Sequence, residues 1–221
     1  MMLLNMAENE FLFQKPDRPV AMSDTAYIAL NLAALGERLA DEGRSIVRHL
    51  DGRVENVAEH SLNLTLIAPV IAERLYPWLD VNLVARFASV HDAVEGYVSD
   101  TPTYNISDEG LKAKEELEAK GLAQFYTDFA DNPGLISTIK NYEAKILPEA
   151  RFVRVLDKCM PLLNHFMEGG RSLREHFNSE ELLINSAIVA ARLIRQYPEY
   201  NEIIDMRNEL ASLAALYLLD G

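Results

Sequence analysis

The segment ENVAEHSLNLTLIAPVIAERLY (residues 55–76) predicts a long helix that carries one histidine. From residue 56 onward its apolar side chains recur with the spacing of an amphipathic helix, and Pro77 ends the pattern. His60 stands in this helix beside Glu59, among leucines and isoleucines. A histidine in such surroundings is either a hydrogen-bonded core residue or a ligand, and this segment alone favours the core residue.

A second histidine lies in ARFASVHDAVEGY (residues 85–97), where His91 is followed directly by Asp92. Asp80 is expected to cap the helix that contains residues 81–94. A histidine and a carboxylate in a largely apolar helix are costly unless something compensates them, and one compensation is a metal ion. Imidazole nitrogen and carboxylate oxygen together suit Mn, Fe, Co, Ni or Zn. Neighbouring helical residues point about 100° apart, so both can reach one ion only if it lies between their two directions, which suits a site near a helix end.

The rest of the chain is mostly helical in pattern. Strand signals are nearly absent, and we find no hairpin dipeptide between alternating runs. Residues 96–107 (GYVSDTPTYNIS) have the composition of a loop, and Asn132-Pro133-Gly134 forms a turn. We therefore predict an all-α fold, a single-domain helical bundle over residues 23–221 after an irregular N-terminal arm at residues 1–22. Further helices are expected at residues 24–41, 108–130, 149–168, 179–196 and 200–219, with a short one ending near residue 146.

Composition excludes several classes of function. The chain has 221 residues, which suits one domain, and its net charge of -13 disfavours binding to nucleic acid. It contains no apolar run of membrane-spanning length and no signal-peptide pattern at its N-terminus. The single cysteine, Cys159, cannot form an internal disulfide, which fits a reducing compartment. We therefore expect a cytoplasmic protein without membrane or nucleic-acid partners.

Three motifs in order resemble one known family. RVENVAEHS (Arg53–Ser61), HDAVEGYVSDTP (His91–Pro102) and VRVLDKC (Val153–Cys159) are similar to motifs of the HD-domain superfamily of metal-dependent phosphohydrolases. Within it they look closest to the bacterial 5′-deoxynucleotidases. Each motif alone is weak, but their joint occurrence over about residues 44–170 is specific.

The resemblance implies a metal centre. His60, His91, Asp92 and Asp157 would hold one divalent transition metal (Mn, Co, Fe, Ni or Zn, with Mg less expected). Glu95 lies three residues after Asp92 on the same helix face. In the family a glutamate at this place assists the attacking water, so Glu95 and Asp92 are the candidate catalytic residues. Alternatively, Asp157 could pair with Lys158 or Arg154 at a surface.

The resemblance also implies substrate contacts. Asp100 matches an aspartate that packs against the sugar and disfavours a 2′-hydroxyl, although it could instead cap a turn. An arginine before the first motif binds phosphate in the family, and Arg44 is the best match here. Arg48 and Arg53 remain alternatives because the spacing from Arg44 to His60 differs slightly, and Lys114 is a further candidate. The other histidines, His49, His165 and His176, are expected at the surface, and Cys159 in the core.

These roles together predict an enzyme that removes the 5′-phosphate of deoxyribonucleoside monophosphates. Its partner would be a small nucleotide, and we expect a homodimer because the family often forms dimers. One alternative is a deoxynucleoside triphosphate triphosphohydrolase, for which Lys112, Lys114, Lys140 and Lys145 would supply charge. A non-catalytic nucleotide-sensing module and a purely structural helical bundle remain further alternatives.

Overall fold

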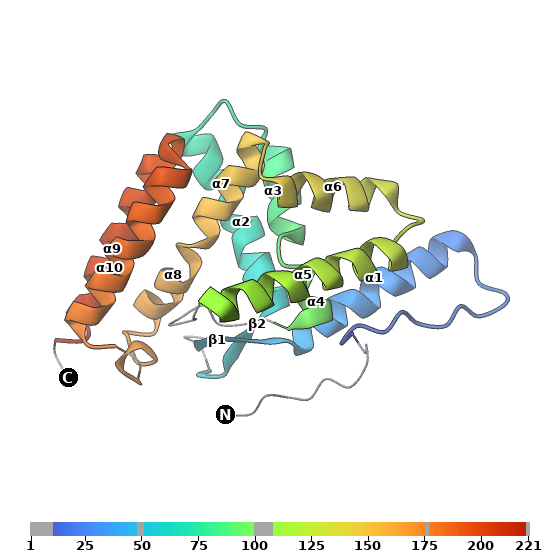
Figure 1. Cartoon of the computed structure of the whole chain (residues 1–221), viewed down its shortest axis with the longest axis horizontal. Helices are drawn as coiled ribbons and strands as arrows, with labels where there is room; N and C mark the ends of the chain where they lie inside the picture. Colours follow the sequence, from blue (N-terminus) through green and yellow to red (C-terminus); the bar gives the residue numbers. More distant parts are fainter. Residues whose placement is uncertain (1–10, 48–50, 100–107, 176, 220–221) are drawn as a thin grey trace. The chain divides into compact units, whose positions relative to one another are not determined.

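The computed structural model describes residues 11–47, 51–99, 108–175 and 177–219, and most of them are helical (Figure 1). This confirms the all-α fold class. The helices are α1 (Asp24–Asp41), α2 (Val57–Leu75), α3 (Val81–Val90), α4 (Glu95–Val98), α5 (Asp108–Asp128), α6 (Pro133–Ala144), α7 (Pro148–Asp157), α8 (Met160–Met167), α9 (Ser179–Gln196) and α10 (Asn201–Leu216), with short 3₁₀ helices η1 (Leu173–Glu175) and η2 (Pro198–Tyr200) and strands β1 (Gly43–Val47) and β2 (Val54–Asn56).

The chain divides into two compact units. Unit 1 comprises Met1–Gly43, Asn56–Ala58 and Asp92–Ser137, and unit 2 comprises Arg44–Glu55, Glu59–His91 and Thr138–Gly221. The single domain over residues 23–221 stays a prediction. None of the described helices is long and apolar enough to cross a membrane.

Several helices begin where side chains cap them, as the sequence predicts. The Ser23 hydroxyl accepts a hydrogen bond from the backbone N–H of Ala26 at the start of α1. Asp80 accepts from two backbone N–H groups in the first turn of α3. Such caps satisfy N–H groups that have no partner inside the helix.

Two predicted helices end earlier than expected. The segment 81–94 is helical only to Val90, and a turn follows at residues 91–94. The segment 149–168 is interrupted after Asp157 and resumes at Met160. Pro161 explains this break, because it has no N–H and its ring would clash with the carbonyl of residue 157 in a continuous helix. Both breaks leave a predicted metal ligand at the end of a helix.

The sequence prediction of no hairpin was wrong. Strands β1 and β2 form a two-stranded sheet. The segment between them, residues 48–53, is too short for the crossover that parallel strands need, so the pair is antiparallel. It contains Asp51-Gly52, a common hairpin dipeptide, and Gly52 has φ of 71°.

The core of unit 2 is built around α7. Phe152, Val153, Val155 and Leu156 of this helix are all fully buried. Helix α7 packs against α3 and α10, and in Figure 1 it lies between them. The ring of Phe152 lies 5.7 Å from that of Tyr76, between centroids. Helix α7, which ends at Asp157, is therefore packed against two other helices.

The described part of the N-terminal arm, residues 11–22, contains no helix or strand. It is nevertheless attached to unit 1 through aromatic contacts. Phe13 is buried, with its ring centroid 5.1 Å from that of Tyr97. The backbone N–H of Leu12 donates to the carbonyl of Tyr97 at 3.1 Å. The arm therefore contributes to the core of unit 1.

Replacing Tyr97 with Phe is expected to lower the free energy of unfolding by about 1.5–3 kcal/mol. The Tyr97 hydroxyl donates to Oδ2 of Asp128 at 2.9 Å. Burial and the Asp128 carboxylate raise the pKa of Tyr97 above its ordinary value, so the phenol stays neutral and remains a donor. Urea unfolding measures the change. Tyr197→Phe is the control, because no hydrogen bond of the Tyr197 hydroxyl occurs among the described residues; equal losses in the two variants would contradict the prediction.

Candidate metal centre

Three side chains from separate helices converge within unit 2. His60 lies in the first turn of α2, His91 directly follows α3, and Asp157 is the last residue of α7. Nε2 of His60 lies 3.0 Å from Oδ1 of Asp157, and Nε2 of His91 lies 3.8 Å from the same oxygen. All three residues are buried, with 1%, 4% and 5% of their surfaces exposed. The structure therefore brings together three of the four predicted metal ligands.

The donor atoms of this cluster fit a divalent metal. One nitrogen from each histidine and one oxygen from Asp157 lie within 4.8 Å of one another. Ligand atoms that are each about 2.0–2.2 Å from a common ion lie roughly 3–4 Å apart, which matches the distances to Asp157. Two imidazoles and a carboxylate suit borderline transition metals better than Mg, which prefers oxygen ligands.

The hydrogen bonding of His91 makes Nε2 the ring nitrogen that can bind a metal ion. Nδ1 of His91 lies 2.8 Å from the backbone carbonyl of Ala88. A carbonyl can only accept, so Nδ1 carries the hydrogen. The lone pair of neutral His91 is then on Nε2, the nitrogen nearer to Asp157.

Asp157 is held in its charged form. Burial alone would raise its pKa, but Lys158, followed by His60 and His91, lowers the pKa well below the usual value. Oδ2 of Asp157 lies 2.7 Å from Nζ of Lys158, while Oδ1 faces the histidines. The pairing with Lys158 that the sequence offered as an alternative therefore coexists with a place in the cluster. Arg154 is more distant, because its Nη1 lies 4.0 Å from Oδ2 of Asp157.

Glu55 and Asn164 support the cluster, and the sequence prediction missed both. Glu55 is 2% exposed, and its Oε1 accepts a hydrogen bond from Nδ2 of Asn164 at 3.0 Å. Its Oε2 lies 3.7 Å from Nδ1 of His60 and 3.7 Å from Nε of Arg44. A carboxylate beside the second nitrogen of a histidine ligand orients the ring and increases its basicity. Glu55 belongs to the ENVAEHS motif, and this motif could have predicted its role. Nothing in the sequence near Asn164 indicates that it contacts Glu55.

The predicted phosphate-binding residues lie in different surroundings. Arg44, in β1, is next to Glu55 and so belongs to the buried network around His60. Arg53 is partly exposed and forms ion pairs with Glu59 and Asp51. Its hydrogen bond to Glu59 raises the pKa of its guanidinium, which stays charged. Lys114 belongs to α5 of unit 1, and its Nζ lies 3.5 Å from Oε1 of Glu118.

Other predicted site residues stay predictions. Asp92 follows His91 in the turn, and Glu95 begins α4; both belong to unit 1. Asp100 and the alternative Arg48 lie outside the described residues.

The prediction that His165 is a surface residue was wrong. His165 is buried, and its Nδ1 lies 3.1 Å from the hydroxyl of Ser172 and 3.3 Å from Oε1 of Glu168. Its polar sequence neighbours are its partners, because the chain turns back on itself after α8. Cys159 is fully buried as predicted, and His49 and His176 lie outside the described residues.

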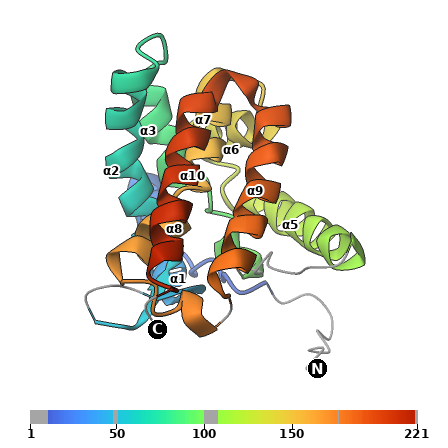
Figure 2. The same ribbon diagram turned by 90° about the vertical axis from the view of Figure 1, so that its left-hand side faces the viewer.

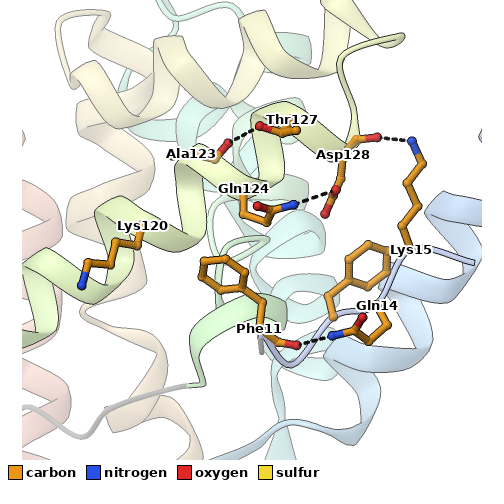
Figure 3. Close-up of a pocket in the computed structure, with 9 residues that line it drawn as sticks. Phe11, Gln14, Lys15, Lys120, Ala123, Gln124, Thr127 and Asp128 are labelled. Carbon is orange, nitrogen blue, oxygen red and sulfur yellow. Dashed lines mark hydrogen bonds between the residues drawn. The ribbon is translucent and has the colours of Figure 1, made fainter. Parts of the chain in front are cut away.

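A separate pocket of about 820 Å³ lies within unit 1 (Figure 3). It is lined by four residues of the arm, Phe11, Phe13, Gln14 and Lys15, and by residues of α5. Nζ of Lys15 donates to the backbone carbonyl of Asp128 at 2.5 Å. Nε2 of Gln124 donates to Oδ1 of the Asp128 side chain at 2.9 Å. None of the predicted site residues lines this pocket.

The helical fold and the two histidines with Asp157 are features of one class of protein. The family model of the HD domain matches residues 36–197, so the chain belongs to the HD domain family. The matched range contains His60, His91 and Asp157.

Individual relatives agree with this assignment. The chain is 31% identical over 112 residues to human 5′-deoxynucleotidase HDDC2, a match that covers 50% of this chain and 53% of the relative. The Xenopus laevis protein of the same name is 30% identical over 110 residues, covering 49% and 53%. The chain thus spans about half the length of the curated relatives it matches.

Solved structures share the fold. A protein from Magnetospirillum magnetotacticum MS-1, described as a predicted metal-dependent phosphohydrolase, matches with a TM-score of 0.67 at 24% identity, covering 86% of this chain and 92% of the other. A conserved hypothetical protein from Pyrococcus furiosus matches with a TM-score of 0.51 at 22% identity, covering 79% and 98%.

Proposed function

We propose that this protein is a metal-dependent phosphohydrolase that removes the 5′-phosphate from deoxyribonucleoside monophosphates. The observation that carries the proposal is the buried convergence of His60, His91 and Asp157, whose donor atoms lie within 4.8 Å of one another. Burying charged and polar side chains is costly unless they pair with one another or coordinate a metal ion. The names of the HDDC2 relatives support a deoxynucleotide as the substrate.

Each residue has a defined task in this proposal. His60, His91 and Asp157 would hold the metal, with Asp92 as the fourth ligand. A bound divalent metal lowers the pKa of water and neutralises phosphate oxygens. Arg44 would donate its N–H groups to the phosphate, and its place beside Glu55 orients the guanidinium. Glu95 would accept a proton from the attacking water, and Asp100 would contact the sugar.

The remaining expectations belong to the same proposal. A cytoplasmic location and the lack of nucleic-acid or membrane partners rest on composition and on the single cysteine. The identity of the metal among Mn, Co, Fe, Ni and Zn depends on affinity and on availability in the cell.

The test is a product analysis. The protein is treated with a chelator, loaded separately with Mn, Co, Zn or Mg, and incubated with the four deoxyribonucleoside monophosphates, AMP and dATP. Chromatography is expected to show deoxynucleoside and inorganic phosphate from the monophosphates, with less turnover of AMP. Tripolyphosphate released from dATP would instead support the triphosphohydrolase alternative. Metal binding without turnover on the whole panel would support the non-catalytic module.

Replacing Glu55 with Gln is expected to weaken metal binding by about 10- to 100-fold, the usual effect of losing a residue that orients a ligand. Glutamine keeps the shape but removes the charge that faces His60 and Arg44. Isothermal titration with Mn or Co measures the affinity without any need for activity. Glu73→Gln, at an exposed position of α2, is the matched control. An affinity equal to that of the control would refute this role for Glu55.

A further inference from the structure

The pocket of about 820 Å³ in unit 1 has the size and the lining of a site for a small molecule. Pockets of this kind usually enclose about 300–1,000 Å³ and combine apolar surface with a few polar groups. One wall is the arm, and the other is helix α5, which can be followed in Figure 2. Phe11, Phe13 and Ala123 supply the apolar surface. The polar groups come from Gln14, Lys15, Lys120, Gln124, Thr127 and Asp128.

Positive charge predominates at this pocket, although the chain as a whole has a net charge of -13. Two lysines, Lys15 and Lys120, line it together with a single acidic residue, Asp128. Lys120 is exposed, and it forms no ion pair with any residue that the structure describes. Ammonium groups placed together can attract an anion even on an acidic protein. The charge of the lining therefore favours an anionic ligand.

The carboxylate of Asp128 is already committed to other partners. Its Oδ2 accepts a hydrogen bond from the Tyr97 hydroxyl at 2.9 Å, and its Oδ1 accepts one from Nε2 of Gln124 at 2.9 Å. Nζ of Lys15 donates to the backbone carbonyl of the same residue. Among the described residues of the lining, Lys120 is therefore the charged group that is left for a ligand.

The aromatic surface of the pocket is held in place by the arm. Nε2 of Gln14 donates to the backbone carbonyl of Phe11 at 2.9 Å. The ring of Phe11 makes an edge-on contact with that of Tyr97, with 6.0 Å between centroids. In the view of Figure 3, the Phe11 ring lies between Lys120 and Lys15. An aromatic surface and two cations thus line the same pocket.

We propose that this pocket binds a small aromatic carboxylate. The ring of the ligand would pack against Phe11, and its carboxylate would accept a hydrogen bond from the ammonium group of Lys120. An inorganic anion would leave the apolar surface of Phe11 and Phe13 unused. An uncharged aromatic compound would leave Lys120 without a partner. An aromatic acid matches both features of the lining.

Titration of the full-length chain with cinnamate, an aromatic carboxylate, and with cinnamamide, its uncharged analogue, tests the proposal. Lys120→Gln is expected to raise the Kd for cinnamate by about threefold and to leave that for cinnamamide unchanged, because it removes one exposed charge. Phe11→Ala is expected to raise both Kd values by about fivefold, because it removes the aromatic contact. Lys112→Gln, at an exposed position of α5 outside the pocket, is the matched control and should change neither value.

Proteolysis of the arm provides an independent measurement. A ligand that packs on Phe11 stabilises the attached arm. At a cinnamate concentration about ten times its Kd, chymotrypsin cleavage after Phe11 or Phe13 is expected to slow by about tenfold. Mass spectrometry identifies the cleaved bonds, and cinnamamide at the same concentration should protect them less.

Each result decides for or against the proposal. Weaker binding of cinnamate to Lys120→Gln and of both probes to Phe11→Ala, with Lys112→Gln unchanged, supports it. Equal affinity of the wild-type chain for the two probes overturns it, because the carboxylate would then not be recognised. Binding that neither pocket variant alters places the probe elsewhere, for example at the metal centre, and also overturns it, as does the lack of saturable binding at millimolar concentration. These outcomes do not depend on whether the protein hydrolyses nucleotides.

Discussion

Asp157→Asn is expected to lower metal affinity by more than about 100-fold, beyond the usual effect of losing a residue that only orients a ligand, and to remove detectable phosphate release. Oδ1 of Asp157 lies 3.0 Å from Nε2 of His60 and 3.8 Å from Nε2 of His91, so this oxygen lies next to both imidazoles. Asparagine keeps the shape but loses the negative charge. Titration with Mn or Co measures binding, and chromatography of products measures turnover.

The control for this variant is Asp205→Asn, at an exposed position of α10. This variant makes the same Asp-to-Asn change in unit 2, at a residue outside the cluster of His60, His91 and Asp157. We expect it to keep both its metal affinity and its phosphate release. Circular dichroism confirms that the helices of both variants remain folded. Normal metal affinity and turnover in Asp157→Asn would remove the basis of the proposed metal centre.

Phe152→Ala is expected to lower the free energy of unfolding by about 3–5 kcal/mol. Phe152 is fully buried, and its ring lies 5.7 Å from that of Tyr76 and 5.8 Å from that of Tyr200. The truncation removes contacts and leaves a cavity in the core of unit 2. Urea unfolding followed by circular dichroism measures the loss.

An exposed apolar residue provides the comparison for Phe152. Leu66→Ala, at a position 64% exposed, should change the free energy of unfolding by less than about 1 kcal/mol. Similar losses in the two variants would mean that Phe152 does not hold the core together. Since α7 carries both Phe152 and Asp157, the core substitution is also expected to weaken metal binding.

Local sequence signals predicted the helices well. The caps at Ser23 and Asp80 fix the starts of α1 and α3, and the residues that cap a helix are close to it in the chain. The predicted helix at residues 179–196 has the same bounds as α9. The early end of α7 could have been predicted from Pro161, and the β1–β2 pair from Asp51-Gly52.

The candidate site could not be predicted from local sequence patterns alone. His60 and Asp157 are separated by 97 residues, and only the resemblance to a family joined them before the structure did. Asn164 meets Glu55 across 109 residues, and no periodicity or motif reports such a contact. The burial of His165 likewise depends on a turn that brings Glu168 and Ser172 back to it.

The two helix breaks have an electrostatic consequence for the cluster. Peptide dipoles add along a helix and give its C-terminal end a partial negative charge of roughly half an electron. His91 and Asp157 stand at the C-terminal ends of α3 and α7, so the backbone itself attracts a cation at this place. No side-chain substitution removes that attraction. A weak, salt-sensitive affinity for divalent cations should therefore persist even when Asp157 is neutral.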